Sequence, residues 1–387
     1  MTDQQDVVND QENPIVPEDA PTTSSEEADG AQNVAPMDPS SPQDAPSAGP
    51  EASAYAAQTV AGPSYGLPED VKRRFADVYA NLEREIGKVF VGQKELVLGA
   101  LVALFSGGHV LVESVPGLGK TLFASALGRA LGCKFGRIQF TPDLMPSDVI
   151  GAPVFNMKTQ EFKFHPGPVF AQILLADEIN RAPAKTHSAL LEAMQEGAAT
   201  VDGTTHLLPT PFFVIATQNP IESEGTYRLP EAQVDRFMFK LVTDYPVEQD
   251  EFKILAEHSQ HIDTKDKLLK VQPVLSAEEI LAMRKIVNDV YVAPQLLDYI
   301  NKIVRATRNF PRLAFGASTR AGLALVQGSR TLAVFQGRGF ATPDDVAKIV
   351  APALRHRVYL SPEAEIEGRD VDEILAALVR SIDVPRM

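Results

Sequence analysis

The stretch that decides the fold is His109–Leu122, which reads His-Val-Leu-Val-Glu-Ser-Val-Pro-Gly-Leu-Gly-Lys-Thr-Leu. It opens with an apolar run, His109–Glu113, that predicts a buried strand, and it leads into Leu122–Leu131, whose spacing predicts a helix. Small residues fill the short loop between them. A strand, a glycine-rich loop ending in Lys-Thr and a helix, in this order, predict a loop that binds phosphate groups.

The residue types in this loop suit a polyphosphate. Gly117 and Gly119 let the main chain wrap closely, so that backbone N–H groups point inward, and the helix N-terminus adds a favourable dipole. Lys120 brings positive charge to the β- and γ-phosphates, and the Thr121 hydroxyl is a ligand for Mg²⁺. ATP and Mg²⁺ are therefore the expected cofactors. The residues expected to contact the nucleotide here are Ser114, Val115, Pro116, Gly117, Leu118, Gly119, Lys120, Thr121 and Leu122.

Ser114 departs from the usual pattern, which has glycine at the first position of the loop. Serine is small, so the turn is retained if this residue has no need of a positive φ. Nucleotide affinity is the property that serine at this position would change. The alternative interpretation of the whole stretch is a glycine-rich turn that joins a strand to a helix without binding a ligand.

A second apolar run, Ile173–Ala176, ends abruptly in the acids Asp177 and Glu178. Such a run predicts a strand buried on both faces of a sheet, and its acids then lie at the carboxyl end, where open α/β sheets bind ligands. Asp177 is a candidate ligand of Mg²⁺, and Glu178 is the candidate base that polarises the attacking water. The alternative is a pair of acids that merely ends a buried strand.

Asn219 and Arg236 are two further candidates. Asn219 follows the apolar run Phe212–Thr217 and is placed to orient the water; the alternative is a simple Asn-Pro turn. Arg236 is expected just beyond the last strand of the sheet. Arginine stabilises the charge that develops on a transferring phosphoryl group, and a neighbouring subunit can supply it. The alternative for Arg236 is a surface arginine paired with Asp235 or another acid.

Short strands and helices alternate from Pro68, where the first helix is predicted to begin, to about residue 242. Phe135–Phe140 adds a strand to the three runs already described. This alternation predicts an α/β fold in which helices flank a parallel sheet. We assign it to a domain of residues 67–245.

Helix starts replace the strand signals beyond residue 246, so a helical domain of residues 246–387 is expected. Ser276 and Glu279 form a predicted capping box, and Thr342-Pro343-Asp344-Asp345 predicts another helix start. Arg320 opens a further predicted helix, from which it is a candidate to reach the nucleotide. The run Arg355-His356-Arg357 near a helix end is interpreted as complementing the helix dipole.

Residues 1–66 differ from the rest in composition. They contain 12 acidic residues and no Lys or Arg, and they are rich in Pro, Ser and Ala, which predicts a disordered acidic tail. A solubilising leader and a partner-docking segment both remain possible roles. The formal net charge of −15 comes mostly from this tail, because 36 basic residues face 39 acidic ones in residues 67–387. A nearly neutral remainder without a dense Lys/Arg block makes nucleic acid an unlikely partner.

The chain shows no sign of membrane insertion or export. Its longest apolar stretch, Leu98–Phe105, is far shorter than the roughly 20 residues that cross a bilayer, and the N-terminus lacks a basic region followed by an apolar one. Cys133 is the only cysteine, so no internal disulfide is expected. The predicted location is cytoplasmic.

Together, these motifs in this order resemble the AAA+ module of the MoxR ATPases, which belong to the P-loop superfamily. The resemblance covers roughly residues 70–387 and leaves only the tail outside it. The stretches that support it are Val91-Gly92-Gln93, Ser106–His109, Thr141–Leu144, Pro146–Asp148, Pro166–Pro168 and Asp177–Pro183.

The resemblance implies a P-loop ATPase domain followed by a helical lid. It also implies a homo-oligomer, a ring of six subunits in which each active site is completed by the neighbour. In its terms Lys120 and Thr121 belong to Walker A, Asp177 and Glu178 to Walker B, Asn219 is sensor 1, Arg236 is the arginine finger and Arg320 is sensor 2. Val91 and Gly92 would lie near the adenine.

Two segments resemble structural insertions of this branch. Gly151–Gly167 resembles its insertion within a helix, and Thr200–Leu208 resembles its second β-hairpin. In the family both would line the upper face or pore of the ring, where a client protein is gripped. Phe155, Phe162 and Phe164 of the first segment are interpreted as core residues rather than gripping ones.

The resemblance favours an ATP-driven remodelling chaperone that acts with a von Willebrand factor A domain protein on client proteins or complexes. A nucleic-acid-dependent ring motor, similar to a helicase, is one alternative. Another is a scaffold that binds ATP with little turnover, an alternative that Ser114 keeps open.

Overall fold

The computed structural model of the chain describes residues 66–220, 227, 229–260 and 263–386. The tail predicted for residues 1–66 therefore lies outside the described residues, apart from Gly66. In the described part, no helix is both long and apolar enough to cross a membrane.

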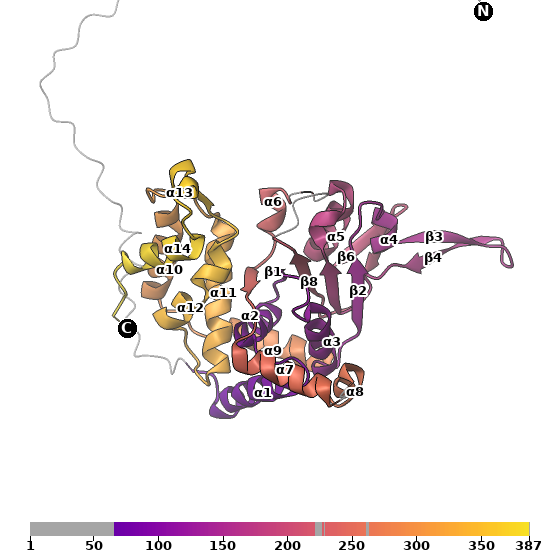
Figure 1. Cartoon of the computed structure of the whole chain (residues 1–387), viewed down its shortest axis with the longest axis horizontal. Coiled ribbons are helices and arrows are strands. Elements are labelled where there is room, and N and C mark those ends of the chain that lie inside the picture. Colours follow the sequence, from indigo (N-terminus) through magenta and orange to yellow (C-terminus); the bar gives the residue numbers. More distant parts are fainter. Residues whose placement is uncertain (1–65, 221–226, 228, 261–262, 387) are drawn as a thin grey trace, which may run out of the picture. The chain divides into compact units, whose positions relative to one another are not determined.

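A five-stranded parallel sheet forms the centre of the α/β part, in the order β2-β5-β8-β1-β9 (Figure 1). Its strands are β1 (Val110–Ser114), β2 (Phe135–Gln139), β5 (Ile173–Asp177), β8 (Phe213–Gln218) and β9 (Phe239–Thr243). The first four confirm the strands predicted from the sequence, to within one residue at each end. The expectation that the sheet ends before Arg236 is wrong, because β9 follows this residue and pairs with β1.

The central strands are buried on both faces, as their continuous apolar runs predict. In β1, Leu111 belongs to one hydrophobic core, whereas Val110 and Val112 belong to the other. Likewise, Leu174 of β5 lies in the first core and Leu175 in the second. A parallel sheet covered in this way brings the carboxyl ends of its strands to a common edge, where ligands bind.

Helices cover this sheet. They are α1 (Glu69–Gly87), α2 (Lys94–Phe105), α3 (Lys120–Ala130), α4 (Pro146–Ile150), α5 (Ala184–Glu196) and α6 (Glu231–Val234), with a 3₁₀ turn η1 (Ile179–Arg181). Helix α1 begins directly after Pro68, as predicted, and carries Glu69 and Asp70 in its first turn, where acids favour the helix dipole. Helix α3 begins at Lys120, so the phosphate loop leads straight into its N-terminus.

Two antiparallel hairpins are added to the sheet domain: β3 (Gly151–Asn156) with β4 (Glu161–Pro166), and β6 (Ala198–Val201) with β7 (Thr204–Leu207). The second confirms the predicted hairpin. The interpretation of the phenylalanines as core residues is wrong for Phe155 and Phe162, which are 47% and 72% exposed and pack on each other with ring centroids 5.2 Å apart. Phe164 is half-buried and stacks on His206 at 3.9 Å.

The rest of the chain is mainly helical, as predicted. Its helices are α7 (Glu248–Ser259), α8 (Thr264–Leu269), α9 (Ala277–Asn288), α10 (Pro294–Thr307), α11 (Thr319–Phe335), α12 (Pro343–Leu354), α13 (Pro362–Ile366) and α14 (Val371–Arg380). A small sheet of β10 (Leu313–Phe315) and β11 (Tyr359–Leu360) was not predicted. The capping boxes at the starts of α9 and α12 confirm both predicted helix starts. The boundary between residues 245 and 246 stays a prediction.

Candidate nucleotide site

The loop between β1 and α3 has the conformation that phosphate binding needs. Gly117 and Gly119 have φ values of 86° and 76°, a region that side chains with a Cβ rarely adopt. A Cβ added at Gly117 would meet no atom within 4 Å, so the positive φ explains this glycine better than crowding does. The Lys120 ammonium donates hydrogen bonds to the carbonyls of Ser114 (3.2 Å) and Val115 (3.4 Å), which keeps it over the loop.

Ser114 is the last residue of β1 and is buried. It is not one of the non-glycine residues with positive φ in the described part of the chain, which are Gln93, Gln160, Glu178 and Asp202. The first position of the loop is therefore compatible with a side chain, and serine imposes no backbone strain.

Asp177 ends β5 and is 7% exposed. Its Oδ1 accepts a hydrogen bond from the Thr217 hydroxyl of β8 at 2.7 Å. Its Oδ2 forms an ion pair with the Arg137 guanidinium of β2 at 2.7 Å. Contacts from both neighbouring strands thus hold the carboxylate at the sheet edge.

Glu178 follows in the left-handed conformation, with φ 55°. Its backbone N–H donates to the Thr217 hydroxyl at 2.9 Å, so this threonine bonds to both acids of the pair. The Glu178 carboxylate accepts a hydrogen bond from Gln139 at 2.8 Å and forms an ion pair with Arg181 at 3.1 Å. A positive φ in a non-glycine residue costs about 1 kcal/mol or more and is common where a side chain is re-aimed at a functional site.

Asn219 is buried directly after β8, at the sheet edge where β5 also ends. It lines a cavity of about 440 Å³ together with Glu113, Asn180 and Gln218. In the preceding residue, the Gln218 amide donates to Glu113 at 2.5 Å, and Glu113 forms an ion pair with Lys240 at 2.8 Å. The end of β8 is therefore fixed to both β1 and β9.

A separate cavity of about 430 Å³ adjoins the phosphate loop. Val91 lines it next to Gly117 and Leu118 of the loop, and Ile254 and Leu255 of α7 line it from the second half of the chain. Gly92 does not line this cavity; it lines an adjacent one of about 470 Å³ and has φ 75°. The mostly apolar wall suits a flat aromatic base beside the phosphates.

The arrangement fits a magnesium nucleotide on the chemistry of its donors. The loop presents two positive-φ glycines and a lysine, the Thr121 hydroxyl opens α3, and the Asp177 carboxylate lies at the same edge of the sheet. Backbone N–H groups and an ammonium suit phosphate oxygens, and hydroxyl and carboxylate oxygens are the donors that Mg²⁺ prefers.

Comparison with known proteins agrees with this geometry. Residues 109–239 match the ATPase family associated with various cellular activities (AAA), and residues 305–378 match the AAA lid domain. Protein YeaC of Bacillus subtilis is 45% identical over 78% of this chain and 92% of its own length. Chaperone MoxR1 of Mycobacterium tuberculosis is 40% identical over 84% of this chain and 88% of its own.

The chain belongs to the MoxR family of AAA+ ATPases. The fold agrees, because the crystal structure of a candidate ATPase from Cytophaga hutchinsonii superposes with a TM-score of 0.76 at 40% identity, covering 82% of this chain and 98% of that one. The predicted fold class, an AAA+ α/β domain with a helical lid, is confirmed.

The two arginines singled out in this MoxR-family chain lie in different surroundings. Arg236 stands between α6 and β9 and is half-buried; its Nε is buried without a hydrogen-bond partner among the described residues. Arg320 lies in the first turn of α11 and forms an ion pair with Asp235 at 3.4 Å. The alternative in which Asp235 neutralises Arg236 is wrong, because this acid pairs with Arg320 and with Arg357 instead.

Three residues that shape this MoxR-family site were not singled out from the sequence: Arg137, Gln139 and Thr217, which contact the acids from neighbouring strands. Arg357 was named only as a complement to the helix dipole, whereas it contacts the segment around Arg236. A side chain that points along the sheet edge carries no local motif. The alternation in Arg137-Ile138-Gln139, with Ile138 buried between two polar residues, is the one signal that marks a face turned away from the core.

Proposed function

We propose that this chain is a magnesium-dependent ATPase that uses ATP hydrolysis to remodel client proteins. The observation that carries the proposal is the shared sheet edge: Asp177 and Glu178 at the end of β5 and Asn219 after β8 face the end of β1, which leads into the phosphate loop. Family membership supports the same function, since the matching family model is of ATPases and a relative 40% identical is named a chaperone.

Each residue has a separate task. The backbone of residues 114–119 and the Lys120 ammonium bind the phosphates, and Thr121 and Asp177 would hold Mg²⁺. When bound, the metal ion would neutralise charge on the phosphate oxygens. Glu178 accepts a proton from water as it attacks the terminal phosphorus, and the Asn219 amide orients that water. Val91 and the apolar cavity beside the loop bind the base, with Gly92 close by.

Arg236 completes the site of a neighbouring subunit in a six-membered ring. Its lack of an ion-pair partner among the described residues supports this task, because an arginine that stabilises a transferring phosphoryl group needs its charge available. Arg320 acts as a second arginine from the lid. Remodelling by the ring would use lid movement during the ATP cycle, with a von Willebrand factor A domain protein presenting the client.

The test is Glu178→Gln, which keeps the hydrogen-bonding shape of the side chain and removes the base. We expect ATP binding at the wild-type level, with hydrolysis reduced by about 100-fold or more. Glu192→Gln, at an exposed position on α5, is the matched control and keeps full turnover. A wild-type protein that binds ATP without turnover would support the scaffold instead. Stimulation by DNA with a steep salt dependence would support the nucleic-acid motor.

The chaperone part has its own test. Chemically unfolded luciferase is diluted into buffer with the protein and ATP, and aggregation is followed by light scattering. We expect suppression that depends on ATP and is lost in Glu178→Gln. Hydrolysis without any effect on aggregation would leave the ATPase in place and contradict the remodelling role for this probe.

A further inference from the structure

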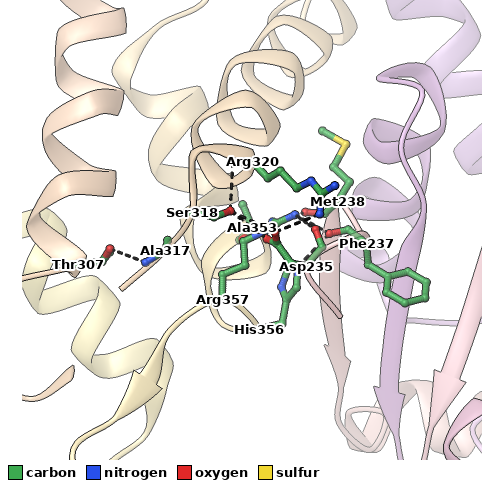
Figure 2. A network of polar contacts seen from close by, with 10 residues as sticks. All are labelled: Asp235, Phe237, Met238, Thr307, Ala317, Ser318, Arg320, Ala353, His356 and Arg357. Atoms are coloured by element: carbon green, nitrogen blue, oxygen red, sulfur yellow. Dashed lines mark hydrogen bonds and ion pairs between the residues drawn. The ribbon is translucent and has the colours of Figure 1, made fainter. Parts of the chain in front are cut away.

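Arg357 reaches from the lid into the segment that carries Arg236 (Figure 2). Its side chain is 3% exposed, and its guanidinium donates to the carbonyls of Asp235 (3.0 Å), Phe237 (2.7 Å) and Met238 (3.0 Å). It also forms an ion pair with the Asp235 carboxylate at 2.7 Å. One buried side chain thus binds the main chain on both sides of residue 236.

Two more lid residues bind the segment around Arg236. Burial lowers the pKa of His356 well below its ordinary value, so the ring is neutral and its single N–H donates to the Phe237 carbonyl at 3.0 Å. The Ser318 hydroxyl, at the start of α11, donates to the Asp235 carboxylate at 3.2 Å. The interpretation of Arg355–Arg357 as a complement to the helix dipole is therefore incomplete, because only one side-chain bond of this run within the described residues, from Arg357 to the Ala353 carbonyl at 2.5 Å, serves the end of α12.

The core holds the same segment from its other side. The Met238 N–H donates to the His109 carbonyl at 2.8 Å, just before β1, and β9 then continues from Phe239 beside that strand. Residues 235–238 therefore lie between the strand that leads to the phosphate loop and the lid residues 356 and 357. The backbone carbonyls of residues 235, 237 and 238 all accept hydrogen bonds from Arg357. The Arg236 side chain makes none of these bonds, and its Nε has no hydrogen-bond partner among the described residues.

We propose that Arg357 is a positioning residue for the arginine finger: it fixes the main chain around Arg236 to the lid, so that the lid of one subunit sets the finger that acts on the next. The inference rests on the proposed ATPase ring. Its physical basis is that a planar guanidinium with five N–H donors binds several acceptors in fixed directions, which a lysine ammonium does not reproduce. A misplacement of about 1 Å costs roughly 100-fold in rate where charge must be positioned.

The experiment separates a subunit's own site from its neighbour's. Arg357→Gln and Arg357→Lys are assayed for folding by circular dichroism, for ATP affinity with a fluorescent analogue and for steady-state hydrolysis. We expect native spectra, ATP affinity close to wild type and kcat reduced by about 10- to 100-fold, with Arg357→Lys between Arg357→Gln and wild type. Arg338→Gln, which breaks the Arg338–Asp345 ion pair inside the lid, is the matched control and keeps kcat.

Mixed rings decide the direction of the effect. Lys120→Ala removes nucleotide binding in its own subunit and leaves Arg236 intact, so its finger can serve a neighbouring Arg357→Gln subunit. We expect the mixture to be more active than Arg357→Gln alone, and we expect the same gain when Lys120→Ala is mixed with Arg236→Ala. Arg357→Gln mixed with Arg236→Ala should show no gain.

Other outcomes overturn the inference. If Arg236→Ala is complemented by Lys120→Ala and Arg357→Gln is not, the defect lies in the subunit's own site and Arg357 does not position the finger. The inference also fails if Arg357→Gln and Arg357→Lys both turn over at the wild-type rate. Should Arg357→Gln fail to fold, the mixtures are made with Arg357→Lys and with Asp235→Asn, which removes the carboxylate partner. A wild-type protein without hydrolysis contradicts the proposed function first, and the inference with it.

Discussion

Arg137 on β2 and Asp177 on β5 form an ion pair across adjacent strands, with 2.7 Å between Nη2 and Oδ2. The same Nη2 donates to Gln139 Oε1 at 2.7 Å, and the Gln139 amide N–H in turn donates to Glu178 Oε2 at 2.8 Å. One arginine is thereby connected to the proposed metal ligand directly and to the proposed base through one glutamine. Side chains of β2 thus connect the two acids of the site.

Arg137→Met should lower the Mg²⁺ concentration needed for half-maximal hydrolysis, because the guanidinium and the metal ion compete for the same carboxylate. The gain is limited to about fivefold, since an ion pair with a partner 45% exposed is worth roughly 1 kcal/mol or less. The measurement is the Mg²⁺ concentration for half-maximal turnover at fixed ATP. Arg129→Met, at an exposed position of α3, is the control. If Arg137→Met needs more Mg²⁺ than the wild type for half-maximal turnover, the arginine supports the metal site.

Ser114→Gly should leave nucleotide affinity at the wild-type level. Ser114 is extended at the end of β1, so restoring the more usual glycine gives no conformational relief. The expected cost is a free energy of unfolding lower by about 0.5 to 1 kcal/mol, because glycine loses more backbone freedom on folding. Titration calorimetry with ADP, alongside denaturant unfolding, checks both parts. Markedly tighter binding by the variant would show that the serine hinders the loop.

Thr217→Val should impair both stability and turnover. The hydroxyl is fully buried and bonds to Asp177 and to the Glu178 N–H, and valine removes both bonds without changing the shape of the side chain. We expect the free energy of unfolding to fall by about 1 to 3 kcal/mol, with kcat reduced as well. Thr331→Val, which removes a buried hydroxyl bonded to Ser106, is the control for stability alone. If kcat falls equally in both variants, the effect of Thr217 is not specific to the acids.

The strands that are buried on both faces of the sheet were predictable from the sequence. Strands β5 and β8 lie inside the sheet, and all positions of Ile173–Ala176 and Phe213–Ala216 belong to one core or the other, so the apolar run stands out. Strand β9 escaped prediction because its apolar run is broken: Lys240 interrupts it to pair with Glu113, and Val242 is 47% exposed.

The site divides in the same way. The residues of the phosphate loop and the acid pair have sequence motifs because the chain itself brings them together, and the structure places them at one sheet edge. Arg137, Thr217 and Arg357 act across strands or between lid and core, at a distance of 40 or more positions along the chain in each of their contacts with Asp177 or Asp235. Such contacts depend on strand order and lid packing, which local patterns do not contain.

The stability of the protein should fall as the pH drops below about 6.5, because buried histidines must stay neutral. The His109 ring is buried beside β8 and α5: its Nδ1 accepts from the Val214 N–H at 3.1 Å, and its Nε2 faces the Met194 carbonyl at 3.3 Å. Burial lowers the pKa of His109 to about 4, and the nearby charge of Arg284 acts in the same direction. The unfolded chain therefore binds more protons than the folded one between pH 6.5 and 4. Stability present above pH 6.5 is lost as the pH falls toward 4.

At pH 5 the contribution of His109 amounts to about 2 kcal/mol, from the difference between its folded and unfolded pKa values. Urea unfolding at about pH 7.5 and about pH 5 measures the decrease, to which His356 adds. His109→Gln does not titrate and should flatten the dependence by about this amount. An equal decrease in the variant would place the titrating groups elsewhere.

Phe162→Ser should change the free energy of unfolding by less than about 0.5 kcal/mol, as substitutions at exposed positions do. The ring lies on the β3–β4 hairpin and is 72% exposed, with Phe155 as its packing partner across the strand pair. Phe213→Ala, in the buried strand β8, is the contrasting control and should cost about 3 to 5 kcal/mol. Basal ATP hydrolysis should stay unchanged in Phe162→Ser, because the hairpin contributes no residue to any of the three cavities described at the site. A large loss of stability in Phe162→Ser would restore the interpretation of this ring as part of a core.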